Sequence, residues 1–159
     1  MTMAVKENEI VNTRWMDNMS FETEINGHKI IIDADSDVGG EDLGPRPKPF
    51  MLAALGGCTG MDVVSILKKM RVEFRQLNVK VEGKLTTEHP RKFHHMHVTY
   101  EIEGDNLPLE KIQKAVSLSE DRYCGVSAVY KEALKLSSEI VLKSEKTGSF
   151  KQIGMLPGS

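Results

Sequence analysis

A long amphipathic helix between residues 49 and 71 constrains the fold more than any other feature of the sequence. Its apolar residues and one threonine recur at intervals of three or four positions: Leu52, Leu55, Thr59, Val63, Ile66 and Met70. This spacing places them along one side of an α-helix. Lys68, Lys69 and Arg71 near its end suit the negative pole of a helix dipole. We therefore expect a single long helix on which the other elements pack.

Three glycines and a cysteine stand inside this predicted helix. Gly56, Gly57 and Gly60 each cost about 1 kcal/mol relative to alanine in a helix interior, and Cys58 lies among them. Because glycine has no Cβ, the helix surface is flat there, and another helix or backbone segment can approach closely. The pattern predicts a tight contact zone around the thiol. Taken alone, this segment is more typical of a cysteine that serves as a small core residue.

Strand patterns occur on both sides of the helix. The alternation around Asn26-Gly27 predicts an N-terminal antiparallel hairpin, and a long Gly- and Pro-rich loop follows over residues 33–49. Alternation over 77–85 and again over 96–102 predicts a second hairpin. The remaining expected elements are a helix opening at Asn106 and Pro108 and ending near 119–123, a short helix over 126–136 and a last strand over 138–142. The predicted fold class is α+β, because the strands come in runs rather than alternating with helices.

Length and charge set the expected organisation. A chain of 159 residues fits one domain, which we place at 1–143, with a flexible C-terminal tail at 144–159. Lys and Arg number 21 against 23 Asp and Glu, a net charge of −2, so nucleic acid is not the expected partner. The longest uncharged run, 49–61, has 13 residues, too few to span a bilayer, and the charged N-terminus does not resemble a signal peptide. We expect a cytoplasmic protein without a membrane segment.

The second cysteine, Cys124, follows residues 119–123 at an expected junction between two helices, where a thiol can be reached. Two cysteines do not make a disulfide framework, and a structural bridge is not expected in a reducing cytosol. If Cys58 and Cys124 lie on adjacent elements, one thiolate can be oxidised to a sulfenic acid and the other can trap it as a disulfide. The two are 66 positions apart, so neither a CxxC redox motif nor a CxxC metal knuckle is present. The fold alone decides whether they meet.

Four segments resemble the OsmC/Ohr-like family, and within it the YhfA-like branch. The resemblance covers about residues 10–142. The residues that carry it are Gly39-Gly40-x-x-Leu43-Gly44-Pro45-x-Pro47, Leu52-x-x-Leu55-Gly56-Gly57-Cys58-Thr59, Asp62-Val63-Val64-x-Ile66-Leu67-x-Lys69-Met70-Arg71, and Leu118-Ser119-x-x-x-Tyr123-Cys124.

This resemblance implies a fold, an assembly and an activity. The implied fold is an intertwined homodimer in which antiparallel sheets from both chains wrap two long cysteine-bearing helices. The better-known members are thiol peroxidases for organic hydroperoxides, and their first cysteine attacks the peroxide while the second resolves the sulfenic acid. Those roles fall on Cys58 and Cys124. The resemblance also implies an external dithiol reductant of the lipoyl type and no bound cofactor.

The residues that would activate the thiol depart from the family pattern. Peroxidase members carry a glutamate ten positions before the first cysteine, where this chain has Lys48. Candidate substitutes are Glu41 as the carboxylate, with Arg46 or Arg14 as the cation that lowers the thiol pKa; the loop residues Glu41 and Arg46 are equally typical of solvated surface charges. Asp62 lies four residues after Cys58, on the same helical face, where its charge would raise the thiol pKa.

Other interpretations of the sequence remain open. The departures above leave open a non-peroxidase module that binds a small apolar or thiol-reactive molecule in the same dimer pocket, and a purely structural dimer is the third interpretation. The cluster His94-His95-x-His97 suggests a metal site, because imidazole binds zinc, copper or nickel. Only His95 and His97 share a strand face, however, and neither has a carboxylate or cysteine beside it. We expect the histidines to lie on a solvent face, and no metal is expected.

Overall fold

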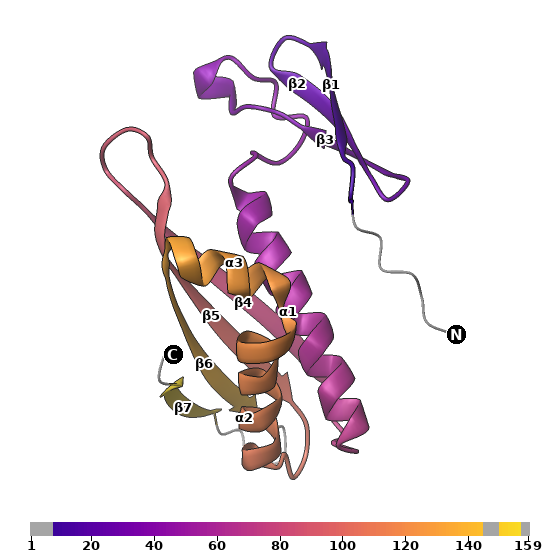
Figure 1. The fold of residues 1–159 in the computed structure, drawn as a ribbon, viewed down its shortest axis with the longest axis vertical. Helices are drawn as coiled ribbons and strands as arrows, with labels where there is room; N and C mark the ends of the chain where they lie inside the picture. Colours follow the sequence, from indigo (N-terminus) through magenta and orange to yellow (C-terminus); the bar gives the residue numbers. More distant parts are fainter. Residues whose placement is uncertain (1–7, 145–149, 157–159) are drawn as a thin grey trace. The chain divides into compact units, whose positions relative to one another are not determined.

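The computed structural model describes residues 8–144 and 150–156. The chain divides into two compact units, Met1–Phe50 and Met51–Ser159, which we describe separately. The first holds a three-stranded antiparallel sheet in the order β1-β2-β3 (Figure 1). Its elements are β1 (Asn12–Asp17), β2 (Ser20–Ile25), β3 (His28–Ile32) and the short 3-10 helix η1 (Ser36–Val38). The predicted N-terminal hairpin is therefore confirmed, with its turn at Asn26-Gly27.

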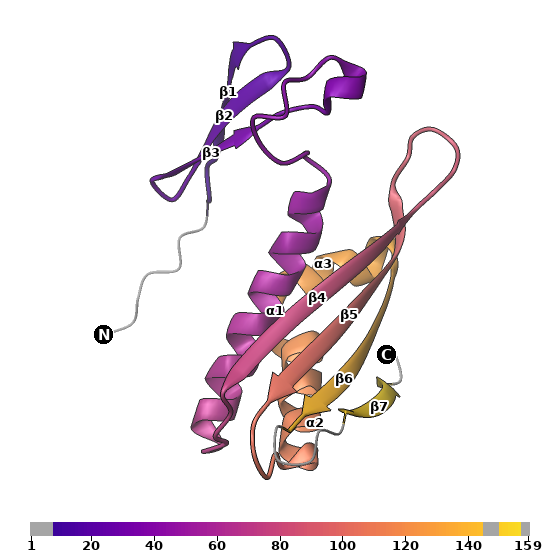
Figure 2. The same cartoon turned by 180° about the vertical axis from the view of Figure 1, so that it is seen from behind.

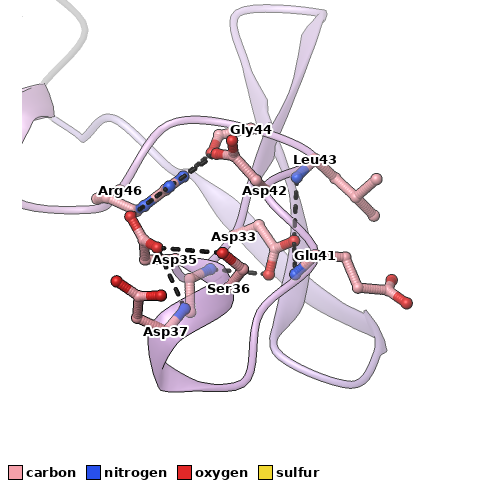
Figure 3. A network of polar contacts seen from close by, with 10 residues as sticks. Asp33, Asp35, Ser36, Asp37, Glu41, Asp42, Leu43, Gly44 and Arg46 are labelled. Carbon is pink, nitrogen blue, oxygen red and sulfur yellow. Dashed lines mark hydrogen bonds and ion pairs between the residues drawn. The ribbon is translucent and has the colours of Figure 1, made fainter.

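Asp33 organises the long loop that follows β3. Its side chain is buried and accepts hydrogen bonds from the backbone N–H groups of Ala34, Glu41 and Leu43 at 2.7, 3.0 and 3.1 Å (Figure 3). These bonds to the charged form lower the pKa of Asp33, the largest contribution coming from Leu43. One carboxylate thus holds both ends of a glycine-rich segment in place.

The second unit is a four-stranded sheet in the order β4-β5-β6-β7 with helices on one face (Figures 1 and 2). Its strands are β4 (Gln76–Leu85), β5 (Phe93–Glu103), β6 (Lys135–Lys143) and β7 (Phe150–Leu156). Its helices are α1 (Pro49–Lys69), which starts at the boundary of the units, α2 (Leu109–Leu118), the π-helical turn η2 (Ser119–Tyr123) and α3 (Gly125–Ala133). The predicted long helix, second hairpin and two later helices are all present.

The last strands differ from the sequence prediction. β6 pairs with β5 in parallel, because the chain crosses back over the sheet through α2 and α3 before β6 begins, and a parallel pair needs such a crossover. The expectation of wholly antiparallel sheets is wrong at this pair. One further strand, β7, pairs antiparallel with β6 inside the segment predicted as a tail. Residues 145–149 and 157–159 of that segment lie outside the described residues.

Helix α1 packs on β4 through its glycines. A Cβ on Gly56 would lie 3.3 Å from the Val81 side chain, and one on Gly60 would lie 3.3 Å from Val79. Nothing lies within 4 Å of a Cβ on Gly57. The close approach predicted from the glycines is therefore confirmed for two of the three. The buried residues of α1 meet the inner side chains of β5 and α2 in one core: Leu55, Val63, Leu67, Met96, Val98, Ile102, Ile112, Ala115 and Val116.

Helix α1 is also long and apolar enough to cross a membrane by length and composition alone. The uncharged run of 13 residues is shorter than this helix, which continues past it through Asp62 to Lys68 and Lys69. In the most apolar stretch of 18 residues in α1, 22% is buried inside the chain. Core helices of soluble proteins meet the same criterion, and Thr59 and Asp62 of this helix form hydrogen bonds with side chains of β5 and η2.

Candidate thiol active site

The two cysteines meet on the helical side of the second unit. Cys58 comes from the middle of α1 and Cys124 from the residue before α3. Their sulfur atoms and a carboxylate oxygen of Asp62 all lie within 4.8 Å of one another. The fold therefore brings the two cysteines together, although they are 66 positions apart in the sequence. Asp62 lies beside Cys58, as its spacing on the helix predicted.

The π turn η2 positions Cys124. The backbone N–H of Cys124 donates to the carbonyl of Ser119 at 2.8 Å, a bond that spans five residues. π turns are rare and are frequent at functional sites. Cys124 then caps α3, because its Sγ accepts a hydrogen bond from the backbone N–H of Ser127 at 3.3 Å. The predicted helix junction is confirmed, but Cys124 is only 3% exposed, so its thiol is less accessible than expected.

Opposing influences act on the Cys58 thiol. Burial is the largest and raises its pKa, and the hydrogen bond with Cys124 and the charge of Asp62 raise it further. A hydrogen bond from the backbone N–H of Val126, in the first turn of α3, acts in the other direction. The net pKa lies above the ordinary value. The direction predicted for Asp62 is confirmed.

A buried chain of hydrogen bonds leads away from Asp62. Ser119 Oγ donates to Asp62 Oδ2 at 3.1 Å and lies 2.9 Å from Thr59 Oγ1. Thr59 Oγ1 lies 2.6 Å from Tyr100 Oη, which lies 3.1 Å from Glu120 Oε1. Thr59, Tyr100 and Ser119 are almost completely buried. The chain connects α1, β5 and η2, and its Asp62 end lies beside the two cysteines.

Both ends of this chain are carboxyl groups, Asp62 and Glu120. Burial is the main cause that raises the pKa of Glu120. Tyr100 Oη donates to Glu120 Oε1, and at the other end of the chain Ser119 Oγ donates to Asp62 Oδ2. Ser138 Oγ donates to the second Glu120 oxygen at 3.2 Å.

Comparison with known proteins identifies the family of this chain. Residues 39–139 match the family described as OsmC-like protein. The chain belongs to the OsmC-like family. It is 33% identical over 125 residues to Protein YhfA of Escherichia coli strain K12, covering 78% of this chain and 90% of YhfA. The expected family and its α+β fold are confirmed.

Solved structures share the fold of this chain. A hypothetical protein from Aquifex aeolicus VF5 has a TM-score of 0.77 at 27% identity, covering 87% of this chain and 98% of the other. The organic hydroperoxide resistance protein OhrB of Bacillus subtilis has a TM-score of 0.59 at 16% identity, covering 84% and 97%. The similarity to OhrB shows that the two proteins share a fold.

The residues predicted to activate the thiol all belong to the first unit. Arg46 forms ion pairs with Asp35 at 3.1 Å and Asp42 at 2.7 Å and donates to the Gly44 carbonyl (Figure 3). Arg14 is exposed and pairs with Glu22 at 3.2 Å. Glu41 and Lys48 are exposed. Their roles at the thiol stay predictions.

Two surface pockets border the thiol cluster. One of about 380 Å³ is lined by Cys124 together with residues of η2 and α3, including Arg122 and Lys131. Another of about 330 Å³ is lined by Asp62, Ile66, Met70 and Tyr123. Each pocket thus includes one residue of the thiol cluster, Cys124 in the first and Asp62 in the second.

The sequence pattern does not single out the polar residues of the buried chain. Thr59 was counted in the apolar stripe of α1, yet a buried hydroxyl needs a hydrogen-bond partner. A threonine on the buried side of the helix therefore predicts a hydrogen-bond partner for its hydroxyl, but the sequence does not identify that partner. Tyr100 and Glu120 come from β5 and η2, 41 and 61 positions away. His95 and His97 share a face as predicted, and both contact Ser137 Oγ, at 2.8 and 2.7 Å. Both are half-buried, and His97 Nε2 lies 3.4 Å from Glu139 Oε1, so the expected solvent face without a neighbouring carboxylate is wrong for these two residues.

Proposed function

We propose that this protein is a cysteine-based peroxidase that reduces organic hydroperoxides in defence against oxidative stress. The observation that carries the proposal is the meeting of Cys58 and Cys124, because a peroxidase of this kind needs a second thiol close to the first. The name of the Bacillus subtilis relative, an organic hydroperoxide resistance protein, supports the choice of substrate class.

The proposed reaction has two steps at the protein. The Cys58 thiolate attacks the terminal peroxide oxygen, the O–O bond breaks, and the departing alkoxide takes a proton to leave as alcohol. Cys58 is then a sulfenic acid. The Cys124 thiol attacks this sulfur, an S–S bond forms and water leaves. Each turnover removes two hydrogens from the chain, which an external dithiol of the lipoyl type returns.

The surroundings of Cys58 support a thiolate only in part. The Val126 N–H and the N-terminal end of α3 favour negative charge at the sulfur. Burial and Asp62 oppose it, so the proposal assigns the missing activation to Arg14 or Arg46, with Glu41 as the carboxylate that holds the cation. We further propose that the protein acts in the cytoplasm as a homodimer.

Cysteine variants test the proposal through peroxide consumption in the presence of a reducing dithiol. Cys58→Ser abolishes consumption of cumene hydroperoxide, because no nucleophile remains. Cys124→Ser leaves a sulfenic acid on Cys58 that dimedone, a reagent for this group, labels. Equal consumption by wild type and Cys58→Ser would overturn the proposal.

A second function is favoured by the raised pKa of Cys58. A thiol that stays neutral reacts slowly with peroxide, and the same scaffold would then act as a module that binds a small apolar or thiol-reactive molecule. Ligand binding that survives loss of both thiols, together with no peroxide turnover, would support this alternative. Saturable turnover of organic hydroperoxide would exclude it as the main function.

A further inference from the structure

The thiol cluster contains three metal-ligand side chains as well as a redox pair. Cys58, Asp62 and Cys124 each point one donor atom to a common space, with all three atoms within 4.8 Å of one another. Cys58 and Asp62 are four residues apart on α1 and so extend from the same face of the helix. Cys124 is fixed opposite them by η2 and α3.

The donor set is chemically specific. Two thiolates and a carboxylate suit Zn²⁺, which binds sulfur at about 2.3 Å and carboxylate oxygen at about 2.0–2.2 Å in tetrahedral geometry. Ligand atoms around such an ion lie roughly 3.5–3.8 Å apart by that geometry. The donors therefore need to move by no more than about 1 Å, which side-chain rotation supplies. Thiolates discriminate against Mg²⁺ and Ca²⁺.

The carboxylate already has the support that metal ligands usually have. Ser119 Oγ donates to Asp62 Oδ2 at 3.1 Å, which orients the carboxylate and leaves Oδ1 for an ion. Ser119 is itself completely buried and is held by Thr59 at 2.9 Å. Such outer partners fix the direction of a ligand, and their loss typically costs about 10- to 100-fold in metal affinity.

We propose that the reduced protein binds one Zn²⁺ per chain through Cys58, Cys124 and Asp62, with a fourth coordination position open to water or a small ligand. The ion replaces both thiol protons, so binding releases two protons and forms two Zn–S bonds. Three protein ligands and an open position are the pattern of catalytic zinc sites.

Metal binding and thiol oxidation exclude each other at this site. When a hydroperoxide oxidises the zinc-bound pair, two protons are consumed, the S–S bond forms, and Zn²⁺, one alcohol and one water are released. Because the disulfide has no thiolate, the oxidised chain no longer holds the ion. The cluster therefore couples metal occupancy to redox state.

Cobalt titration of the reduced, metal-free full-length protein tests this proposal without any peroxide. Co²⁺ in a tetrahedral site with thiolates gives a sulfur-to-metal charge-transfer band and intense visible bands. We expect both bands to saturate at one Co²⁺ per chain and to disappear when Zn²⁺ displaces it. An ion held by His95 and His97 gives no sulfur band, so the readout separates the two locations.

Variants assign the ligands. Cys58→Ser and Cys124→Ser lose the charge-transfer band, Asp62→Asn weakens zinc binding, and Ser119→Ala weakens it by about 10- to 100-fold. Glu110→Gln removes an exposed carboxylate on α2 and leaves affinity unchanged; circular dichroism verifies that each variant is folded. Absence of the sulfur band in the reduced wild type, or affinity unchanged by Asp62→Asn, would overturn the metal site. Neither result bears on peroxide reduction.

Discussion

Glu120 is the residue whose protonation the fold controls most clearly. Its side chain lies mostly buried between Tyr100 and Ser138, and burial raises its pKa above 4.5. The folded chain therefore holds this proton more tightly than the unfolded chain does. The stability that the proton contributes is complete below about pH 4.5 and is lost as the pH rises through the folded pKa. Glu120→Gln keeps the shape of the side chain and removes this titration.

The expected result is a flatter stability profile for Glu120→Gln. Urea unfolding between pH 5 and 8 should show wild-type stability falling relative to the variant as the pH rises. Both proteins contain the other titrating groups, such as His95, whose pKa is lowered by burial. The contribution of those groups to the pH dependence therefore cancels in the difference between the two free energies of unfolding. Glu110→Gln, at an exposed site, should follow wild type. A constant difference between wild type and Glu120→Gln across this range would contradict the raised pKa of Glu120.

At the level of elements, α1 has one side packed on β4 and another side that the second unit leaves uncovered. Met61 is 76% exposed and lies next to Gly57 and Val64 around an apolar hollow. In the proposed homodimer, a second copy of the chain covers this side of α1. Burying a methionine contributes about 1.5–3 kcal/mol, so Met61→Glu should weaken dimerisation by at least about tenfold.

Light scattering after size exclusion measures this effect directly. Wild type and the apolar control Met61→Leu should run at twice the 17.8 kDa chain mass, and Met61→Glu should shift to the single-chain mass on dilution. A wild-type monomer at high concentration would contradict the dimer. Identical dimer dissociation of Met61→Glu and wild type would place the interface elsewhere.

Local sequence patterns predicted the helices and strands better than they predicted which elements pack or pair with one another. The period of α1 and the Asn26-Gly27 turn are encoded within a few residues, so their structures followed from the sequence. The parallel pairing of β6 depends on the path of α2 and α3, and β7 has no comparable local signal. At the site, the Cys58–Asp62 spacing predicted their contact, because both lie on one helix. The approach of Cys124, and the link from Thr59 to Glu120, arise only when distant elements pack.

At the scale of the whole molecule, one pair of thiols connects the proposed redox chemistry with the metal site. Membership of the OsmC-like family and the meeting of Cys58 with Cys124 support a protein that exists in a reduced and a disulfide state. The thiols lie at the junction of α1, η2 and α3, so formation of the bond engages the packing of all three elements. Everything proposed for the function depends on that bond forming with peroxide.

Intact-mass analysis of the reduced, metal-free protein tests this claim most directly. The protein is titrated with cumene hydroperoxide and, separately, with hydrogen peroxide, beside Cys58→Ser. We predict that stoichiometric organic peroxide removes two hydrogens from each wild-type chain and leaves the mass of the variant unchanged. Unchanged wild-type mass with the organic peroxide would contradict the peroxidase and leave the binding module as the better account.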